Sequence, residues 1–576
     1  MHIVLVYPPP WKIVLPGQVP APEGEGPPQG LDAETCLSGD ILNIPYGLLS
    51  LAAQEIKNGH DINVLNLFSF SWKEIEAIIR SYPARLYGLS CFTANRRGTL
   101  LLARLIRKTH PDAHIVVGGP HATALPEEML VHCDAIDSVV IGEGEETFHE
   151  IVQHIEQGKE PAGIAGTASR YKGRITVAPP RSRIEDLDGL SSPFDYFNEY
   201  ILLTSRGCPW DCTFCCSTAL WGRQHRFHSP AYVLDMLERI VTVNGQKAVA
   251  VKDETFTGNK AHVLEICRGI EQRNLNFLWS CDTRADVLDE EILYGMRRAG
   301  CQRISLGIES GSPEILKTIN KNIDLDTVAR STATAKKFGF QVRFYMMAGN
   351  RGETRATLQE SIDFLQAVQP SQVIFNPFTL LPGTREFEIA EREGRATREL
   401  FFTDDFLELQ PLARDTEGPE THSIREWLVA HSGLRDVRDY TISERLAVFK
   451  LLPDTAAAHL DLAGAYYAAG NLDDAERYVT SALDRDYPLP GLALNYAACI
   501  HAKRNNLKET LRYLIKAREA GYHRVVEDNL AAAQEWIRAG GPGSGRPLCL
   551  QGGHGFEVTR PKRQPMTPGK IAYDDV

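Results

Sequence analysis

Short runs of consecutive apolar residues alternate with longer segments of helical periodicity through the first 157 residues. A strand that is buried on both faces reads as a continuous apolar run, so this alternation predicts a doubly wound, mainly parallel α/β sheet. We assign residues 1–157 to one Rossmann-like domain and residues 158–198 to a linker that contains a short hairpin. The expected strands are His2–Tyr7, Ile62–Leu67, Leu86–Ser90, His114–Val117 and Ser138–Ile141.

A second series of apolar runs, again separated by amphipathic segments, begins after residue 198. Six such runs predict six parallel strands, and hence a partial (β/α)6 barrel over residues 199–395. The expected strands are Ile201–Ser205, Ala248–Val251, Phe277–Ser280, Arg303–Leu306, Val342–Met347 and Gln372–Phe375.

The carboxyl-terminal third is helical and charged, with a helical extension over 396–453 and an internal repeat over 454–535. Asn471, Tyr478 and Ala482 recur 35 residues later, a spacing that resembles tetratricopeptide helix pairs. Because such units need about three repeats to be stable alone, we expect these helices to pack on the barrel or on neighbouring helices. They have either a structural role or a role in docking a protein partner. The glycine-rich residues 536–576 are expected to form a flexible tail.

Composition narrows the class of protein. The 576 residues carry 62 Lys and Arg against 74 Asp and Glu, a net charge of −12, which disfavours a nucleic-acid partner. Neither a transmembrane segment nor a signal peptide is expected, so the sequence predicts a cytoplasmic protein. With 12 cysteines in all, a reducing compartment is favoured, and clustered cysteines are expected to bind metal.

The strongest chemical signal is a Cys-x3-Cys-x2-Cys motif formed by Cys208, Cys212 and Cys215. Three thiolates on one loop can hold three irons of a [4Fe-4S] cubane and leave the fourth iron open. Gly207 and Pro209 keep the segment out of a helix, so the sulfurs can converge. Structural zinc is the alternative, but it needs a fourth ligand, and no second cysteine pair is evident downstream.

With Phe214 before the third cysteine, the motif resembles the signature of radical S-adenosylmethionine (SAM) enzymes. Cys216 lies outside the signature, and we interpret it as a spare thiol because a fourth protein ligand would close the open iron. The resemblance implies a [4Fe-4S] cluster held by the three signature cysteines, with SAM bound at the open iron.

Polar residues at strand ends fit the same resemblance. Asp253 and Glu254 stand where the family has Gly-Gly-Glu, which meets the amino group of SAM. Arg284 is expected to hold the methionyl carboxylate, and Glu309 and Ser310 are expected to reach the ribose. Singly, each has a structural alternative, such as a surface ion pair for Arg284 or a helix cap for Asp253. Their joint placement after successive strands favours the cofactor site.

Small and polar residues also follow the strands of the first domain. Taken alone, the glycines read as tight turns. The whole pattern, however, resembles the cobalamin-binding domain found ahead of many radical SAM enzymes. It comprises the Pro-rich first loop, Ile44–Leu48, Gly118–His121 and Gly142–Glu145. The Asp-x-His-x-x-Gly motif is absent, so no lower axial His ligand is expected from it. The expected cobalamin contacts are Thr93, Gly118, Gly119, Pro120, Glu143 and Gly144.

These resemblances together imply a cobalamin-dependent radical SAM enzyme. The leading hypothesis is a C-methyltransferase in which a 5′-deoxyadenosyl radical abstracts hydrogen and methylcobalamin delivers the methyl group to carbon. A cobalamin-containing cyclase or rearrangement enzyme is the first alternative, and a scaffold with a structural cluster is the second. The enzyme hypotheses imply a small-molecule or peptide substrate and a reducing partner such as flavodoxin or ferredoxin.

Overall fold

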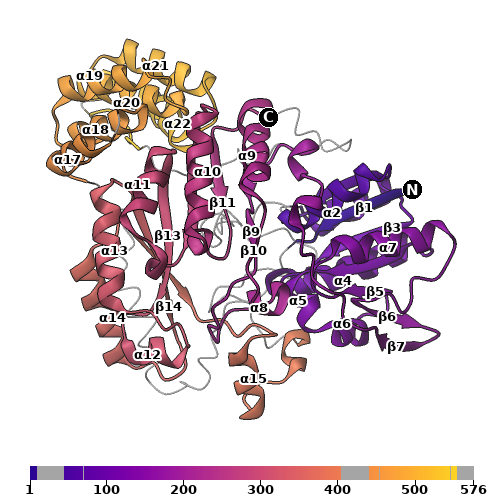
Figure 1. Ribbon diagram of the computed structural model, residues 1–576. Coiled ribbons are helices and arrows are strands. Elements are labelled where there is room, and N and C mark those ends of the chain that lie inside the picture. The colour runs from indigo at the N-terminus through magenta and orange to yellow at the C-terminus, as the bar shows by residue number, and fades with distance from the viewer. Residues whose placement is uncertain (10–44, 69, 404–439, 453, 545, 554–576) are drawn as a thin grey trace.

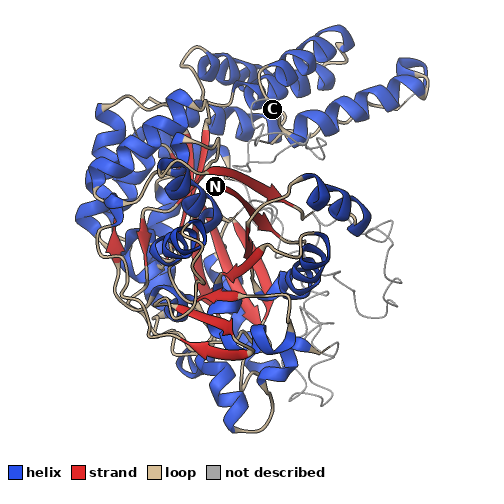
Figure 2. Ribbon diagram, turned by 90° about the vertical axis from the view of Figure 1, so that its right-hand side faces the viewer, coloured by secondary structure: helices blue, strands red, loops and turns tan. Residues whose placement is uncertain are grey.

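Two sheets and a helical unit make up the protein, for which a computed structural model describes residues 1–9, 45–68, 70–403, 440–452, 454–544 and 546–553 (Figure 1). The amino-terminal sheet lies beside the second sheet, and the carboxyl-terminal helices lie at one end of that second sheet. Figure 2 shows that the end unit is built of helices alone, whereas the strands lie in the rest of the molecule.

Seven strands form the amino-terminal sheet. They are β1 (His2–Tyr7), β2 (Asp61–Asn66), β3 (Leu86–Ser90), β4 (His114–Gly118), β5 (Ser138–Val140), β6 (Thr167–Tyr171) and β7 (Arg174–Val177). Their order is β2-β1-β3-β4-β5-β6-β7, with the first five parallel and the last two an antiparallel hairpin. The doubly wound prediction is confirmed, and so is the hairpin after residue 157. The hairpin extends the sheet, so this sheet continues beyond the expected domain end.

Helices cover both faces of this sheet because its strands are apolar on both sides. They are α2 (Tyr46–Lys57), α3 (Trp72–Ser81), α4 (Arg96–Thr109), α5 (Pro120–Ala124), α6 (Pro126–His132) and α7 (Glu145–Glu156). Helices α2 and α7 pack on one face, and α3, α4 and α6 pack on the other. The strand order reverses at β1, which lies between β2 and β3. In open α/β sheets such a reversal marks the crevice in which ligands bind, here at the carboxyl ends of β1 and β3.

The second sheet has six parallel strands in the order β15-β14-β13-β12-β11-β8, which confirms the partial barrel. Its strands are β8 (Ile201–Leu202), β11 (Ala248–Val251), β12 (Leu278–Thr283), β13 (Cys301–Glu309), β14 (Gln341–Ala348) and β15 (Gln372–Pro377). Its helices are α8 (Ser217–Trp221), α9 (Pro230–Glu238), α10 (Lys260–Gln272), α11 (Glu290–Arg298), α12 (Pro313–Thr318), α13 (Leu325–Lys337), α14 (Arg355–Val368) and α15 (Arg385–Arg392).

The first barrel strand is shorter than predicted. Thr204 donates its backbone N–H to the Asp253 carboxylate at 2.6 Å, and the chain leaves the barrel ladder after β8. After two residues outside any strand, the chain forms β9 (Ser205–Arg206), which pairs antiparallel with β10 (Arg226–Phe227) in a separate ribbon. The cysteine motif therefore follows β9 rather than a continuous barrel strand.

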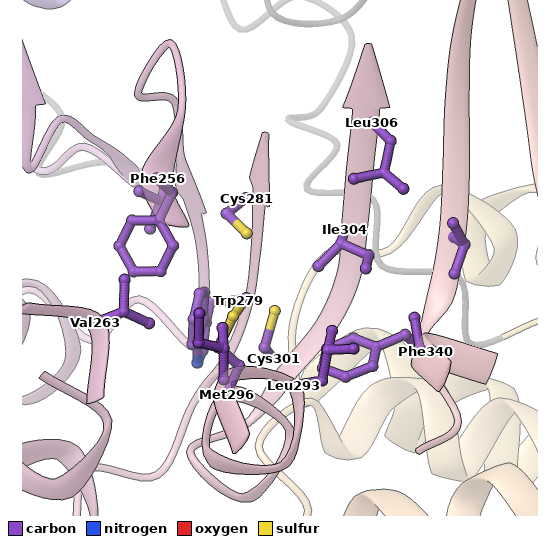
Figure 3. Close-up of a cluster of buried hydrophobic side chains, with 14 of the residues drawn as sticks. Phe256, Val263, Trp279, Cys281, Leu293, Met296, Cys301, Ile304, Leu306 and Phe340 are labelled. Carbon is purple, nitrogen blue, oxygen red and sulfur yellow. The ribbon is translucent and has the colours of Figure 1, made fainter. Parts of the chain in front are cut away.

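The barrel core lies between the strands and the helices outside them (Figure 3). Phe256 and Trp279 meet edge to face with ring centroids 5.5 Å apart, and the Trp279 indole N–H donates to the Ala299 carbonyl at 2.7 Å. Cys281 and Cys301, on β12 and β13, are buried in the same cluster. Their burial accounts for these cysteines as core residues.

The carboxyl-terminal unit packs on the barrel, as the repeat count predicted. Its helices are α17 (Ile442–Leu451), α18 (Ala456–Ala468), α19 (Leu472–Leu483), α20 (Pro490–Lys503), α21 (Leu507–Glu519) and α22 (Arg524–Arg538). Ala248 and Leu278, which begin β11 and β12, share a hydrophobic cluster with this unit. The unit therefore covers the amino ends of the strands, opposite the carboxyl ends. Its assignment as tetratricopeptide repeats stays a prediction.

The tail differs from its prediction where it is described. Helix α22 continues to Arg538, and the Trp536 indole N–H donates to the Arg546 carbonyl at 2.8 Å. Leu548 and Leu550 then pack on the helical unit, so the segment up to Gly553 is held in place. Residues 554–576, and the part of the helical extension over 404–439, lie outside the described residues. Within the described chain, none of the helices is both long and apolar enough to cross a membrane.

Asp461 joins the helical unit to the barrel. Its Oδ2 accepts from Arg297 at 2.8 Å and from Arg445 at 3.0 Å, and all three side chains are buried. Replacing it leaves two buried guanidinium groups without their carboxylate. We expect Asp461→Asn to lower the free energy of unfolding by about 3–5 kcal/mol, measured by chemical denaturation. Asp473→Asn, at a carboxylate whose side chain is 97% exposed, should change it by less than about 1 kcal/mol, and equal effects would contradict the anchor.

Candidate functional site

The cysteine loop depends on a glycine at its start. Gly207 has φ of +90°, and a Cβ there would lie 2.2 Å from the backbone oxygen of Gln224. A side chain is therefore excluded both by the backbone conformation and by the neighbouring backbone of Gln224. This close approach lets the chain turn out of β9 directly into Cys208.

Hydrogen bonds from two distant segments hold the middle of the loop. Thr213 donates its N–H to the Ile319 carbonyl at 2.9 Å and its hydroxyl to Glu386 at 2.6 Å. Asn320 donates its side-chain amide to the Asp211 carbonyl at 2.6 Å. The end of α12 and the start of α15 thus fix the loop between the first and third cysteines.

The three signature thiols lie close enough to perturb one another. Burial raises the pKa of Cys215 to about 12, and Cys216, Cys212 and Cys208 add to that rise. Burial also raises the pKa of Cys212, whereas Lys321 and Arg284 lower it. Three mutually repelling thiolates near two cations are a donor set that suits a cationic metal cluster.

A single metal ion and an iron–sulfur cubane make different demands on three thiols. In the part of the chain that the structure describes, no three His, Cys, Asp or Glu side chains converge on a position for a single metal ion. In a cubane each thiolate binds a different iron, so the sulfurs need not converge on one point. Neighbouring thiols that perturb one another, as these do, are compatible with that arrangement.

The structure separates the roles of the neighbouring carboxylates Asp253 and Glu254. Asp253 is buried, and both of its oxygens accept hydrogen bonds from Thr204 and Ser205 at 2.5–2.7 Å. Its side chain is thus committed to the turn before the cysteine loop. Burial raises the pKa of Glu254 to about 7, and it remains half-exposed near Ser217. Glu254 is therefore the better partner of the two for a ligand ammonium.

Arg284 has a buried guanidinium with a donor to spare. Its Nε and Nη2 donate to Asp286 at 2.9 and 2.7 Å, and the guanidinium stacks on the Trp210 ring at 4.6 Å. Its Nη1 is buried without a hydrogen-bond partner. A buried donor without an acceptor is costly, so the site is suited to an anionic group such as a carboxylate.

The side chains of Glu309 and Ser310 differ in the interactions that hold them. Glu309 has φ of +72°, an uncommon conformation for a residue with a side chain, and pairs with Lys321 at 3.2 Å. The buried Ser310 hydroxyl lies 3.3 Å from that of Ser361 and accepts from the Ser312 N–H at 3.1 Å. The predicted pair thus divides into a carboxylate at the site and a hydroxyl tied to α14.

Lys321 is a site residue that sequence reasoning missed. It is 6% exposed, faces Glu309 and lowers the pKa of Cys212. It lies in the turn after α12, away from any strand end, so the rule that placed the other residues did not reach it. The only sequence signal was its position between two asparagines, Asn320 and Asn322. In the structure both asparagines have φ near +50°.

In the first sheet, residues after β3 and β4 meet at the crevice beside β1. The Thr93 hydroxyl lies 3.1 Å from Nδ1 of His121, whose buried Nε2 has no hydrogen-bond partner. Gly119 has φ of +100°, and a Cβ there would lie 2.7 Å from the Cys91 oxygen. These contacts bring Thr93, Gly119 and Pro120 together, whereas Gly118 has room for a Cβ. A cradle of small residues beside a buried unpaired imidazole suits a large polar cofactor.

The loop after β5 faces the barrel rather than open space. Arg206, directly before Gly207, donates to Glu143 at 2.8 Å and to Glu145 at 2.6 Å. Glu143 also accepts from Arg226 at 2.8 Å, and Glu145 accepts from Ser50 on α2 at 2.8 Å. The Glu143 side chain is therefore occupied by two arginines, and only the backbone of Glu143–Gly144 remains for the predicted cobalamin contact.

This cluster is fully enclosed. The four charged side chains have relative exposures of 3–6%. Burial alone would raise the pKa of Glu145, but the charge and hydrogen bonds of Arg206 hold it below its usual value. The cysteine loop and the edge of the first sheet are thus joined by charge pairs that water does not screen.

Comparison with known proteins supports both the site at the cysteine loop of the barrel and the site in the first sheet. The family model of the radical SAM superfamily matches residues 202–365, and that of the B12 binding domain matches residues 39–152. An uncharacterized methyltransferase, PH0819, of Pyrococcus horikoshii is 32% identical over 359 residues, which cover 60% of this chain and 78% of that protein. The chain belongs to the radical SAM superfamily. It is a radical SAM enzyme with a B12-binding domain ahead of the barrel.

Other relatives of this radical SAM enzyme differ in activity. The anaerobic magnesium-protoporphyrin IX monomethyl ester cyclase of Rubrivivax gelatinosus is 28% identical, and the match covers 50% of this chain and 54% of the cyclase. Two solved structures share the fold. The methyltransferase TsrM from Kitasatospora setae, with cobalamin and a [4Fe-4S] cluster bound, gives a TM-score of 0.54 at 19% identity, covering 68% and 75% of the two chains. OxsB with aqua-cobalamin bound gives 0.58 at 14% identity, covering 94% and 84%.

The cysteine assignment predicts a selective loss of iron. Replacing Cys208, Cys212 or Cys215 singly by Ala removes one ligand of a three-ligand set, so anaerobic reconstitution should fall from about four irons per chain to below about one. Cys216→Ala is the matched control and should keep its iron and its visible absorption. An equal loss in Cys216→Ala would contradict the three-cysteine assignment.

The buried charge cluster predicts that replacing Arg206 weakens the contact between the two domains of this radical SAM enzyme. Arg206→Met leaves Glu145 buried without its guanidinium, so we expect a loss of about 3–5 kcal/mol in the free energy of unfolding. Hydrogen exchange should also become faster in the loop after β5 and in the cysteine loop. Arg223→Met, at a side chain 60% exposed, is the control. Unchanged exchange in Arg206→Met would show that the cluster does not hold the domains together.

Proposed function

We propose that this radical SAM enzyme is a cobalamin-dependent C-methyltransferase. The observation that carries the proposal is the buried cluster of Arg206, Glu143 and Glu145, which joins the cysteine loop to the carboxyl edge of the B12-binding sheet. A radical site and a methyl carrier must both reach one substrate carbon, and this contact places their two loops side by side.

The chain's own residues supply the geometry at the barrel. Cys208, Cys212 and Cys215 would hold the cluster, and three ligands would leave one iron open for SAM. Arg284 would direct its unpaired Nη1 at the SAM carboxylate, with its plane fixed by Trp210 and Asp286. Arg284 would thus act on the SAM carboxylate and on Cys212, whose pKa it already lowers.

Two carboxylates complete the predicted SAM site. Glu254 would accept from the SAM ammonium, whose positive charge favours the ionised form of a carboxyl with a pKa raised to about 7. Glu309 would accept from a ribose hydroxyl, with Lys321 holding it in its left-handed conformation. Asp253 and Ser310 support these groups from behind: Asp253 through Thr204 and Ser205, and Ser310 through Ser361.

At the first sheet, cobalamin would lie over the crevice beside β1. Thr93, Gly119 and Pro120 line that crevice, and the backbone at Gly144 borders it near α2. The chain has no Asp-x-His-x-x-Gly motif, so we propose binding without a lower His ligand from such a motif. When bound, the cluster with SAM supplies one-electron radical chemistry at an unactivated carbon, and cobalamin supplies a methyl carrier.

The likeness to the uncharacterized methyltransferase PH0819, over 78% of that protein's length, supports methyl transfer. The proposed substrate is a small molecule or a peptide with a carbon that lacks a nucleophilic lone pair. The proposed reducing partner is a one-electron donor such as flavodoxin or ferredoxin, which would reduce the cluster before SAM is cleaved. Cyclisation or rearrangement without methyl transfer is the second candidate, which the likeness to the Rubrivivax cyclase favours.

Product analysis separates the two candidates. Methyl transfer consumes one SAM as the radical source and a second as the methyl source. Anaerobic turnover with methyl-labelled SAM should therefore give 5′-deoxyadenosine and S-adenosylhomocysteine in equal amounts, measured by mass spectrometry, with label in the substrate. Cyclisation would give 5′-deoxyadenosine without S-adenosylhomocysteine, and that outcome would reject the methyltransferase proposal.

A control variant tests whether the cluster is catalytic. Cys212→Ala should abolish 5′-deoxyadenosine formation, whereas Cys216→Ala should retain it. Arg284→Lys keeps the charge but loses the planar donor, so we expect the KM for SAM to rise about 10-fold or more. Cleavage of SAM that persists in Cys212→Ala would leave only a scaffold role for the cluster.

A further inference from the structure

Thr213, which directly follows the second signature cysteine, has its N–H, its carbonyl and its hydroxyl all engaged by other segments. The N–H donates to the Ile319 carbonyl at 2.9 Å, and the carbonyl accepts from the Glu386 N–H at 3.0 Å. The hydroxyl donates to the Glu386 carboxylate at 2.6 Å, and the residue is only 4% exposed. The chain after Cys212 is therefore fixed through both backbone and side chain.

Glu386 contributes two of these contacts, and its carboxylate is buried. It is the second residue of α15 and is 4% exposed. An ionised carboxylate in such a position is costly unless it is paired. Arg351 supplies the partner, because its Nε donates to Oε2 at 3.0 Å and its Nη2 donates to Oε1 at 3.1 Å. This two-atom contact fixes the plane of the carboxylate as well as balancing its charge.

The turn that carries Arg351 is held by contacts within the barrel. Glu353 accepts from the N–H groups of Gly349 and Asn350, which closes the turn after β14. The Arg351 guanidinium also donates through Nη2 to the Thr318 carbonyl at 3.3 Å, at the end of α12. The same end of α12 supplies the carbonyl that accepts from the cysteine loop. The position of the guanidinium is thus set by the barrel rather than by a bound cluster.

A second ion pair lies on the other side of Cys212. Asp211, the residue before this cysteine, accepts from Arg385 at 2.6 Å, and the two side chains are 30% and 53% exposed. Water screens an exposed pair of this kind, whereas the Glu386 carboxylate is shielded from water. Of these two pairs, the one at Glu386 therefore carries the buried charge.

A buried charge beside the loop acts on the electron affinity of a cluster that the loop holds. Reduction of a [4Fe-4S] cluster adds one negative charge, so an unpaired carboxylate nearby disfavours the reduced form and an unpaired guanidinium favours it. With both partners present, the two charges oppose each other. Without Arg351, a buried negative charge would remain. Without the charge of Glu386, a positive charge on a side chain that is 38% exposed would remain.

We propose that Arg351 and Glu386 are a positioning pair that orients Thr213 beside the cluster and sets the reduction potential of the cluster by cancelling the buried charge there. Neither residue is a ligand of the cluster in this proposal, because the pair acts through Thr213 and through its electric field. The inference rests on the cluster of the proposed function, but it does not rest on methyl transfer.

The test measures the midpoint potential of the cluster in the reconstituted full chain, by anaerobic redox titration followed by electron paramagnetic resonance. Arg351→Gln should shift the potential to more negative values, and Glu386→Gln should shift it to more positive values. The negative shift should be the larger, because the remaining carboxylate is buried and the remaining guanidinium is partly screened. The double variant should lie between the two single variants, close to the wild type.

Two further variants separate the charge of the pair from its geometry. Arg351→Lys keeps the charge but loses the two-atom contact, so its potential should stay close to that of the wild type. Arg355→Gln removes one positive charge at the exposed start of α14 and should leave the potential unchanged. In the metal-free chain, hydrogen exchange in peptides that contain Thr213 should be faster in Arg351→Gln and in Arg351→Lys than in Arg355→Gln.

Shifts of the same sign in Arg351→Gln and Glu386→Gln, or no shift in either, would overturn the proposal. Folded single variants that fail to assemble the cluster would overturn it as well, because the pair would then be needed to build the site rather than to set its potential. A wild-type chain that binds no iron would reject the cluster and the pair together, so a failure of the proposed function is distinguishable from a failure of this inference.

Discussion

The buried pairing of Arg206 with Glu143 and Glu145 is the constraint on which the rest of the site depends. Arg206 is the last residue of β9 and precedes Gly207. Its ion pairs with the two glutamates therefore hold the chain directly before the cysteine loop. The two glutamates belong to the loop after β5, at the carboxyl edge of the first sheet. The position of one cofactor loop is therefore set by the other, through charges shielded from water.

At the carboxyl end of the barrel, some polar side chains hold turns in place and others are directed at a ligand. Asp253, Ser310 and Thr213 have every polar atom in a hydrogen bond within the chain and hold turns in place. Arg284 is anchored by Asp286 and keeps its buried Nη1 without a partner, and Glu254 is only partly buried. A fixed support behind a partly unsatisfied group is the arrangement that binds a charged ligand without reorganisation.

Much of this architecture was predictable because buried parallel strands leave continuous apolar runs. The run Ala248–Val251 coincides with β11, and the other five barrel strands overlap the apolar runs that predicted them. The break after Leu202 was not predictable, because it depends on Asp253, about fifty residues away. Lys321 was missed because it lies in a turn, and Glu143 was assigned to cobalamin because sequence alone does not show that two distant arginines occupy it. The sequence thus reveals local periodicity and motif chemistry, whereas long-range ionic contacts emerge only in the fold.

The central claim is that one chain holds a three-cysteine cluster and cobalamin at facing sites across the Arg206 contact. The most direct measurement is iron and cobalt analysis with electron paramagnetic resonance of anaerobically reconstituted protein carrying the reduced cluster and cob(II)alamin. We predict about four irons and one cobalt per chain, with magnetic coupling between the two signals. Protein that retains the cluster but binds no cobalamin, or two signals that remain magnetically independent, would contradict the account.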